Sequence, residues 1–237
     1  CALPICSYPP DQLAKLKLVR RLMDLGLRPG RLLSMDNAGL VALLAERCPA
    51  PTGDSGQTRA ALALLREHRG DELQALFRQD IVRDGLSRFV TEIAVPLTAQ
   101  VGEAWMRGEI EVHEEHVFTE QLTGALRAAM PATAPGARPR VLLTTVPGEP
   151  HNLGLLMAEA ALRLEGAACV SLGVQTPLTE VAAAAIAHDV QVVALSFSLN
   201  FPVAAAGTAL TALRGMLPPG LALWCGGGGA ARLRKGP

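Results

Sequence analysis

The feature that most constrains the fold is a change of hydrophobic periodicity at residues 131–139, which read PATAPGARP. Before this segment, apolar residues recur at three- and four-residue spacing, the pattern of amphipathic helices. After it, short apolar runs typical of buried strands alternate with helical segments. The sequence therefore predicts two different kinds of domain, joined by a Pro- and Ala-rich linker.

Four amphipathic helices are expected before this linker. Their predicted bounds are 58–68, 71–84, 87–106 and 112–130. Pro96 falls inside the third helix, which it should kink. Four such helices with short connections are typical of a four-helix bundle, here residues 57–130. A Pro- and Gly-containing linker at 48–57 separates the bundle from two earlier helices, one that stops at Gly26 and one from about Gly30 to Arg47.

Strands and helices alternate from residue 139 to residue 237. Strands are expected at 141–146, 169–172, 190–197 and 221–225, and helices at 153–164, 178–188 and 203–217. Continuous apolar strands in this order indicate a parallel sheet covered on both faces. The fold class is therefore multi-domain, with helical domains followed by a Rossmann-like, flavodoxin-type α/β domain. Ligands of such sheets bind beyond the carboxyl ends of the strands.

Charge and cysteine content narrow the function. Lys+Arg and Asp+Glu balance at 22 each, so the whole chain has no bias toward nucleic acid. Basic residues do cluster between Pro10 and Ser34. Two interpretations of this cluster stay open, a solvated helix face and a contact with phosphate. The five dispersed cysteines without CxxC spacing fit a reducing cytoplasm. No signal peptide or membrane-spanning run is expected.

A histidine follows the first predicted strand, in the segment Glu149-Pro150-His151-Asn152-Leu153-Gly154. A strand-to-helix loop at the carboxyl edge of a sheet lets this side chain project toward a ligand. Glu149 could hydrogen-bond one ring nitrogen of His151 and leave the other as a ligand. Gly154 would allow close backbone approach. By itself, the loop also fits an ordinary surface histidine.

In a second motif, nine residues separate Trp105 from Glu115-His116, and Gly108 marks a turn between two helices. Such a hairpin would bring an aromatic face, a carboxylate and an imidazole to one end of the bundle. A core tryptophan and an acidic helix start explain the same pattern without a ligand, since acidic residues are favoured at helix N-termini.

Together, the two motifs resemble the cobalamin-binding module shared by methionine synthase and the MerR-type light-responsive regulators of the CarH/LitR family. That module is a four-helix bundle followed by a Rossmann-like domain with a D/E-x-H-x-x-G loop, which Glu149, His151 and Gly154 match. In CarH-type proteins a W-x9-E-H element covers the upper face of cobalt, and Trp105 and Glu115-His116 match it. The resemblance covers about residues 58–229.

The resemblance implies a set of cofactor-binding residues and no catalytic ones. His151 would be the lower axial cobalt ligand of adenosylcobalamin. Serine and glycine residues at the strand ends would line the tunnel for the nucleotide tail. The implied positions besides His151 are Trp105, Met106, Glu115, His116, Glu149, Gly154, Ser196, Ser198, Gly226 and Gly227.

Two departures from the family pattern bear on function. In CarH-type proteins a histidine follows the tryptophan and binds cobalt from above after light breaks the cobalt–carbon bond, whereas this chain has Met106. The thioether could bind weakly, or His113 or His116 could take its place, so the upper ligand stays open. Four strand runs stand where the family module has five, so one edge of the nucleotide site is expected to be incomplete.

The segment from Tyr8 to Gly26 resembles the second half of a MerR-type DNA-binding domain, so residues 1–48 are interpreted as a remnant of that domain. The recognition helix of this family should lie upstream and is absent from the sequence. The chain as given is therefore not expected to read DNA, and operator DNA is a partner only if an intact helix-turn-helix precedes it.

The resemblance implies an adenosylcobalamin-binding, light-responsive transcriptional repressor. Its homo-oligomer, a tetramer in the dark, and its DNA binding would change when light cleaves the cobalt–carbon bond. Two alternatives stay open: a light-independent sensor of cobalamin or another tetrapyrrole, and a corrinoid methyl carrier. No enzyme is expected, because Ser196 and Ser198 have no general base at a recognisable spacing and the glycine run 226–229 is not a phosphate-binding loop.

Overall fold

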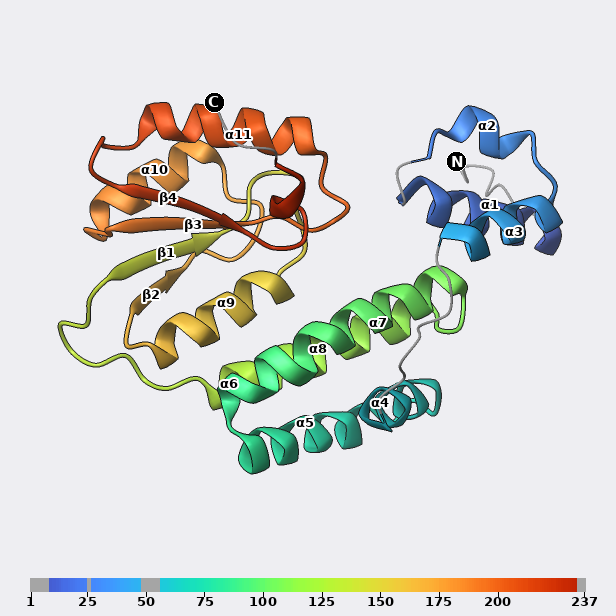
Figure 1. Ribbon diagram of the computed structural model, residues 1–237, viewed down its shortest axis with the longest axis horizontal. Helices are drawn as coiled ribbons and strands as arrows, with labels where there is room; N and C mark the ends of the chain where they lie inside the picture. Colours follow the sequence, from blue (N-terminus) through green and yellow to red (C-terminus); the bar gives the residue numbers. More distant parts are fainter. Residues whose placement is uncertain (1–8, 25–26, 48–55, 234–237) are drawn as a thin grey trace, which may run out of the picture.

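The computed structural model describes residues 9–24, 27–47 and 56–233. Within these residues, three units follow one another along the chain: a group of N-terminal helices, a helical bundle and an α/β domain (Figure 1). Helical domains followed by a parallel sheet confirm the predicted fold class. No helix in the described part of the chain is long and apolar enough to span a membrane.

The N-terminal unit consists of α1 (Pro10–Asp24), α2 (Pro29–Leu33) and α3 (Asn37–Arg47), which share a small apolar core. The single helix predicted from Gly30 to Arg47 is wrong, because the chain breaks between α2 and α3. At the break, the Asp36 carboxylate accepts the N–H of Gly39 at 2.8 Å and so caps α3. The Ser34 hydroxyl donates to the carbonyl of Arg31 at 2.9 Å. These short polar side chains compete for the backbone bonds of a continuous helix. The predicted stop at Gly26 and most of the 48–57 linker lie outside the described residues.

The bundle contains the four predicted helices, with ends within two residues of those expected. Its elements are α4 (Gly56–Arg66), α5 (Gly70–Asp84), α6 (Leu86–Arg88), η1 (Phe89–Ala94), α7 (Val95–Arg107) and α8 (Val112–Ala129). The third predicted helix is the run from α6 to α7. Pro96 has no N–H to donate, and the turn before it widens into the π-helical stretch η1. The kink predicted at Pro96 therefore takes the form of a π-helical segment.

The α/β domain is a four-stranded parallel sheet with strand order β2-β1-β3-β4. Its elements are β1 (Arg140–Thr144), α9 (Leu153–Leu164), β2 (Ala168–Ser171), α10 (Leu178–Ala187), β3 (Val192–Ser196), α11 (Val203–Met216), β4 (Ala222–Gly226) and η2 (Ala230–Arg232). Alternate strand residues face opposite layers. Val141 and Leu143 pack with α9, whereas Leu142 and Val193 pack with α10 and α11 on the other face (Figure 1).

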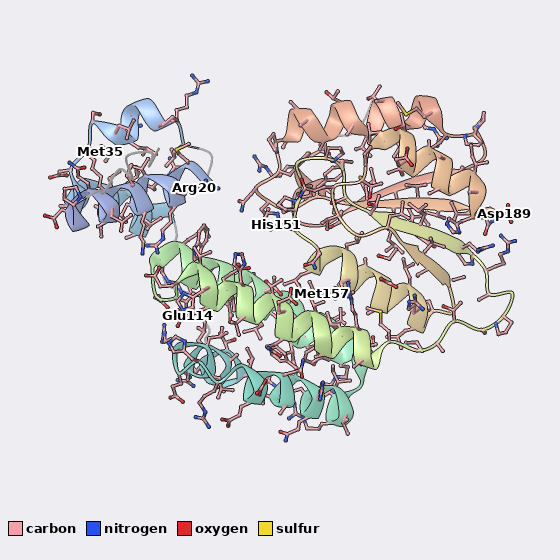
Figure 2. All side chains as sticks on the ribbon, turned by 180° about the vertical axis from the view of Figure 1, so that it is seen from behind. Arg20, Met35, Glu114, His151, Met157 and Asp189 are labelled. Carbon is pink, nitrogen blue, oxygen red and sulfur yellow. The ribbon has the colours of Figure 1, made fainter. Side chains whose placement is uncertain are left out.

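Helix α9 joins the two large units, because it packs on the sheet with one side and on the bundle with the other. Leu153, Leu156, Met157 and Ala160 of α9 belong to the same buried cluster as the bundle core. Helices α8 and α9 lie side by side, with Met157 between the sheet domain and the bundle (Figures 1 and 2). The bundle is thus held on the α9 side of the sheet by shared apolar burial.

The bundle core is centred on Phe77, whose ring meets Phe89 and Phe118 edge-on at centroid distances of 5.9 and 6.1 Å. We expect Phe77→Ala to lower the free energy of unfolding by about 3–5 kcal/mol, because a buried ring is replaced by a cavity. Urea unfolding followed by circular dichroism measures this loss. Val82→Ala on the same helix is the control, since Val82 is 87% exposed. Equal midpoints for the two variants would contradict the packing described.

Candidate functional site

The site lies where the direction of chain winding reverses between β1 and β3. These strands are neighbours in the sheet, but the chain leaves β1 toward α9 on one face and leaves β3 toward α11 on the other. The chain therefore leaves the two strands on opposite faces at the carboxyl edge, which is the usual ligand position in such sheets. The predicted histidine loop follows β1, and the predicted serines end β3 and follow it. Figure 2 shows His151 at this margin, on the side of the α/β domain nearest to the N-terminal helices.

The Glu149 carboxylate connects the two loops. Its Oε1 accepts hydrogen bonds from His151 Nδ1 at 2.5 Å and from the His151 backbone N–H at 3.1 Å. Its Oε2 accepts the backbone N–H of Ser198, in the loop after β3, at 2.7 Å. Glu149 is 1% exposed, whereas the His151 side chain is 56% exposed. The hydrogen bond that the sequence predicts between Glu149 and a ring nitrogen of His151 is therefore present.

The charge of Glu149 fixes the role of each ring nitrogen. Burial raises the pKa of Glu149, but hydrogen bonds from the His151 ring, the Ser198 N–H and the His151 N–H outweigh it and leave the pKa below its usual value. Glu149 is thus ionised at neutral pH and acts only as an acceptor, so Nδ1 carries the proton. Nε2 is then the nitrogen suited to a metal ion, in the arrangement by which carboxylates orient metal-binding histidines.

Two residues that the sequence did not single out hold this loop in place. The buried Thr145 hydroxyl donates to the Glu149 carbonyl at 2.6 Å and accepts the backbone N–H of Gln175 at 2.8 Å. The Gln175 side chain in turn accepts the N–H of Gly148 at 3.3 Å. The sequence signal that could have identified Thr145 is the polar pair Thr144-Thr145 at the end of an apolar strand. No sequence signal marks Gln175, because it reaches this loop only through the tertiary structure.

The predicted serine and glycine positions meet at the ends of β3 and β4. A Cβ added to Gly154 would lie 3.1 Å from Ser196 Oγ, so α9 begins directly against β3. Gly227 has a φ of +85°, and a Cβ there would overlap the carbonyl oxygen of Phe197. Gly226 ends β4 with open space around its Cα, and a Cβ on Gly229, which was not predicted, would overlap the Ser198 carbonyl. Glycines thus let the loops after β3 and β4 approach closely.

The Ser198 hydroxyl is only partly satisfied by the surrounding protein. Its Oγ is buried beside the Glu149 carboxylate and helps to lower the pKa of Glu149, but it makes no well-formed hydrogen bond among the described residues. A buried hydroxyl that is not fully hydrogen-bonded is costly in a folded protein, so this position can take a further polar partner. These features fit a large cofactor that contains a metal ion and has a long tail. The oriented His151 imidazole suits the metal, and the Ser198 hydroxyl and the glycine-lined loops suit the tail.

The second predicted motif lies at the α7–α8 turn. Trp105 is half-buried against the bundle core and Met106 is half-buried beside it in the last turn of α7. Gly108 ends α7 in the left-handed conformation, with a φ of +79°. Glu115 lies in the first turn of α8, where it accepts a hydrogen bond from Thr119 at 3.0 Å and pairs with His116 at 3.1 Å. The predicted helical hairpin is therefore confirmed.

Helix α8 packs against α9, and the α7–α8 turn lies at the end of the bundle beside the N-terminal helices, the side toward which His151 also lies (Figures 1 and 2). The structure brings Glu149, His151, Ser196 and Ser198 into one cluster. It places Glu115 and His116 in a second cluster on α8. The cofactor site is predicted to lie between the two.

Comparison with known proteins agrees with this geometry. A family model described as "B12 binding domain" matches residues 139–234, and a second B12 binding domain model matches residues 56–129. The "HTH-type transcriptional repressor CarH" of Myxococcus xanthus is 30% identical over 94% of this chain and 77% of its own length. This chain belongs to the CarH family.

Membership of the CarH family confirms the resemblance seen in the sequence, and both domain matches support cobalamin as the cofactor. The Methanosarcina barkeri monomethylamine corrinoid protein is 19% identical, with a TM-score of 0.51 over 73% of this chain and 82% of that one. That likeness shows a shared fold of helical bundle and Rossmann-like domain. In this CarH-family chain, His151 with its partner Glu149 is predicted to face the cobalt of the cofactor.

The depressed pKa of Glu149 predicts a pH-dependent contribution to stability. Because the folded pKa lies below the unfolded one, the stabilisation is complete above the ordinary value of 4.5 and is lost as pH falls through the folded pKa. We expect Glu149→Gln to unfold about 1–3 kcal/mol more easily than wild type at pH 7. The difference should shrink at acidic pH. Urea unfolding at several pH values measures it, with Glu165→Gln at the exposed end of α9 as the control at pH 7. A difference that does not vary with pH would contradict an ionised Glu149.

Proposed function

We propose that this chain is the sensory part of an adenosylcobalamin-dependent, light-responsive transcriptional repressor. The observation that carries the proposal is the Glu149-oriented His151 at the strand-switch point, with the hairpin that bears Trp105 at the end of the bundle toward which His151 also lies (Figures 1 and 2). Similarity to a protein named a transcriptional repressor supports the regulatory part. When bound, adenosylcobalamin would supply a light-sensitive cobalt–carbon bond.

The residues of this chain divide into two groups in the proposed site. His151 Nε2 would bind the lower face of cobalt, and Glu149 would hold the ring and make it a stronger donor. Ser196, Ser198, Gly226 and Gly227 would face the nucleotide tail. Trp105, Met106, Glu115 and His116 would cover the upper face. A covered upper face favours a regulator over a methyl carrier, because a carrier must expose the transferred group to partner enzymes.

A direct connection exists between the hairpin and the N-terminal helices. Lys17 on α1 donates a hydrogen bond to Glu111 at 3.1 Å, and this bond lowers the pKa of Glu111. The guanidinium of Arg21 on α1 lies over Gly108, where an added Cβ would come within 2.5 Å of Nη1. In our proposal, Trp105 and Met106 would rest against the bound cofactor, and a change there would reach α1 through the Lys17–Glu111 and Arg21–Gly108 contacts of the hairpin. The response is a shift between two arrangements of the units, which changes homo-oligomer formation and DNA binding.

Met106 favours a second candidate function. A thioether stands where the family pattern has the histidine that binds cobalt after light, and it is half-buried in the last turn of α7. A light-independent sensor of cobalamin, or of another tetrapyrrole, would keep the lower-face residues and would not need this histidine. The two functions predict different behaviour after illumination.

The lower-ligand assignment predicts a spectral change. Wild-type protein mixed with adenosylcobalamin in the dark should give a base-off, histidine-ligated spectrum, and His151→Ala should lose it. Glu149→Gln should weaken binding by about 10–100-fold, the usual effect of removing the partner of a metal-binding histidine. His188→Ala, at an exposed position on the same domain, is the matched control. Histidine-ligated spectra in both histidine variants would exclude His151 as the ligand.

Light tests the rest of the proposal. Size-exclusion chromatography of adenosylcobalamin-loaded protein before and after green light should show a change of oligomeric state. Met106→His should make the lit form more stable, because an imidazole can bind cobalt from above. An unchanged elution volume after complete photolysis would contradict the light switch and favour the light-independent sensor. Preference for methylcobalamin over adenosylcobalamin would favour the methyl carrier.

A further inference from the structure

A second cluster of possible metal-binding side chains lies at the end of the bundle, and of its residues only His113 was considered for the cobalamin site, as an alternative upper ligand. His68 is in the turn between α4 and α5, and His113 and Glu114 are in the first turn of α8. One ligand atom from each of the three lies within 4.8 Å of those of the other two. The two imidazole rings are 5.7 Å apart between centroids and inclined by 37°. Figure 2 shows Glu114 at the end of the bundle nearest to the N-terminal helices.

Glu114 is held in place before any ion binds. Its side chain is buried, and Oε2 accepts the backbone N–H of Glu111 at 2.6 Å in a capping box that begins α8. A carboxylate has several lone pairs, so it can keep this hydrogen bond while it also binds an ion. The bond then serves as the outer-shell contact that orients a metal-binding carboxylate.

We infer that His68, His113 and Glu114 bind a divalent transition-metal ion of the zinc type. Two imidazoles and one carboxylate suit zinc, which also takes three protein ligands with a water in the fourth position. Bond lengths of about 2.0–2.2 Å require the three ligand atoms to draw closer together than they are now. Both histidines are exposed, so small rotations of their rings supply this movement. Glu114 is the fixed member of the set.

The ion would join two segments that are 45 residues apart in sequence, the α4–α5 turn and the start of α8. It would therefore stabilise the folded bundle, with a free energy of unfolding that rises with the logarithm of the ion concentration above the dissociation constant. Glu111 adjoins this site and is also the residue that binds Lys17 of α1. The ion would strengthen the helix start on which the N-terminal unit rests. This inference does not depend on the proposed light response or on cobalamin binding.

Binding of ZnCl2 to the full chain, measured by isothermal titration calorimetry without cobalamin, tests the inference. We expect His68→Ala, His113→Ala and Glu114→Gln each to weaken zinc binding at this site by at least about tenfold. Loss of an outer-shell partner alone typically lowers metal affinity by about 10–100-fold, and loss of a ligand should cost no less. Glu114→Gln separates ligation from capping, because its amide oxygen can still accept the Glu111 N–H. Its metal-free unfolding midpoint should therefore stay close to that of wild type.

Two controls exclude other zinc-binding groups. His188→Ala and His151→Ala should keep the site, since neither residue belongs to it. The absorption spectrum of the Co²⁺-loaded protein should show nitrogen and oxygen ligation without thiolate charge-transfer bands, which separates this site from the cysteines. Three results would each overturn the inference. They are equal zinc uptake by wild type and the three ligand variants, no uptake by wild type, and thiolate bands in the spectrum at one equivalent of Co²⁺.

Discussion

The site depends on one buried carboxylate that satisfies two loops at once. Glu149 follows β1, yet one of its oxygens holds the His151 ring and the other holds the backbone after β3. Without this bridge, the two loops at the strand-switch point would lose the hydrogen bonds that join them, and the imidazole would lose the partner of its Nδ1. Burial of an ionised group is tolerated here because every bond it accepts favours the charged form. A local electrostatic requirement thus fixes the geometry of this edge of the sheet.

Apolar burial on α9 has a second, larger-scale effect. The helix that begins two residues after His151 contributes Leu153, Leu156 and Met157 to the bundle core. The position of His151 and the position of the bundle are therefore set by the same helix. A substitution that changes the α8–α9 packing would alter the space between the two faces without touching any residue that contacts the cofactor.

Local patterns in the sequence were enough to predict most of this architecture. Periodicity located the four bundle helices and the four strands and three long helices of the sheet domain, but not the short η2. The spacing around His151 and Trp105 predicted the loop after β1 and the α7–α8 hairpin, and the roles of these residues toward a cofactor stay predictions. The break at Asp36 was missed because a capping side chain can interrupt an otherwise continuous apolar stripe. Gln175 and the cluster of His68 with His113 were missed because their neighbours are distant in sequence. Side-chain hydrogen bonds between loops leave no periodic signal.

The turn at Gly108 gives the protein a place where recognition and response can be separated by mutation. This residue must be left-handed to end α7, and its bare Cα also leaves room for Arg21 of α1. A side chain there would strain the left-handed turn and displace the Arg21 guanidinium, while the residues around His151 lie in another domain. A descendant of this protein that replaced Gly108 would keep its ligand chemistry and depend on the Lys17–Glu111 pair to connect the hairpin to α1. Ligand binding and the response of the N-terminal helices could therefore diverge in evolution.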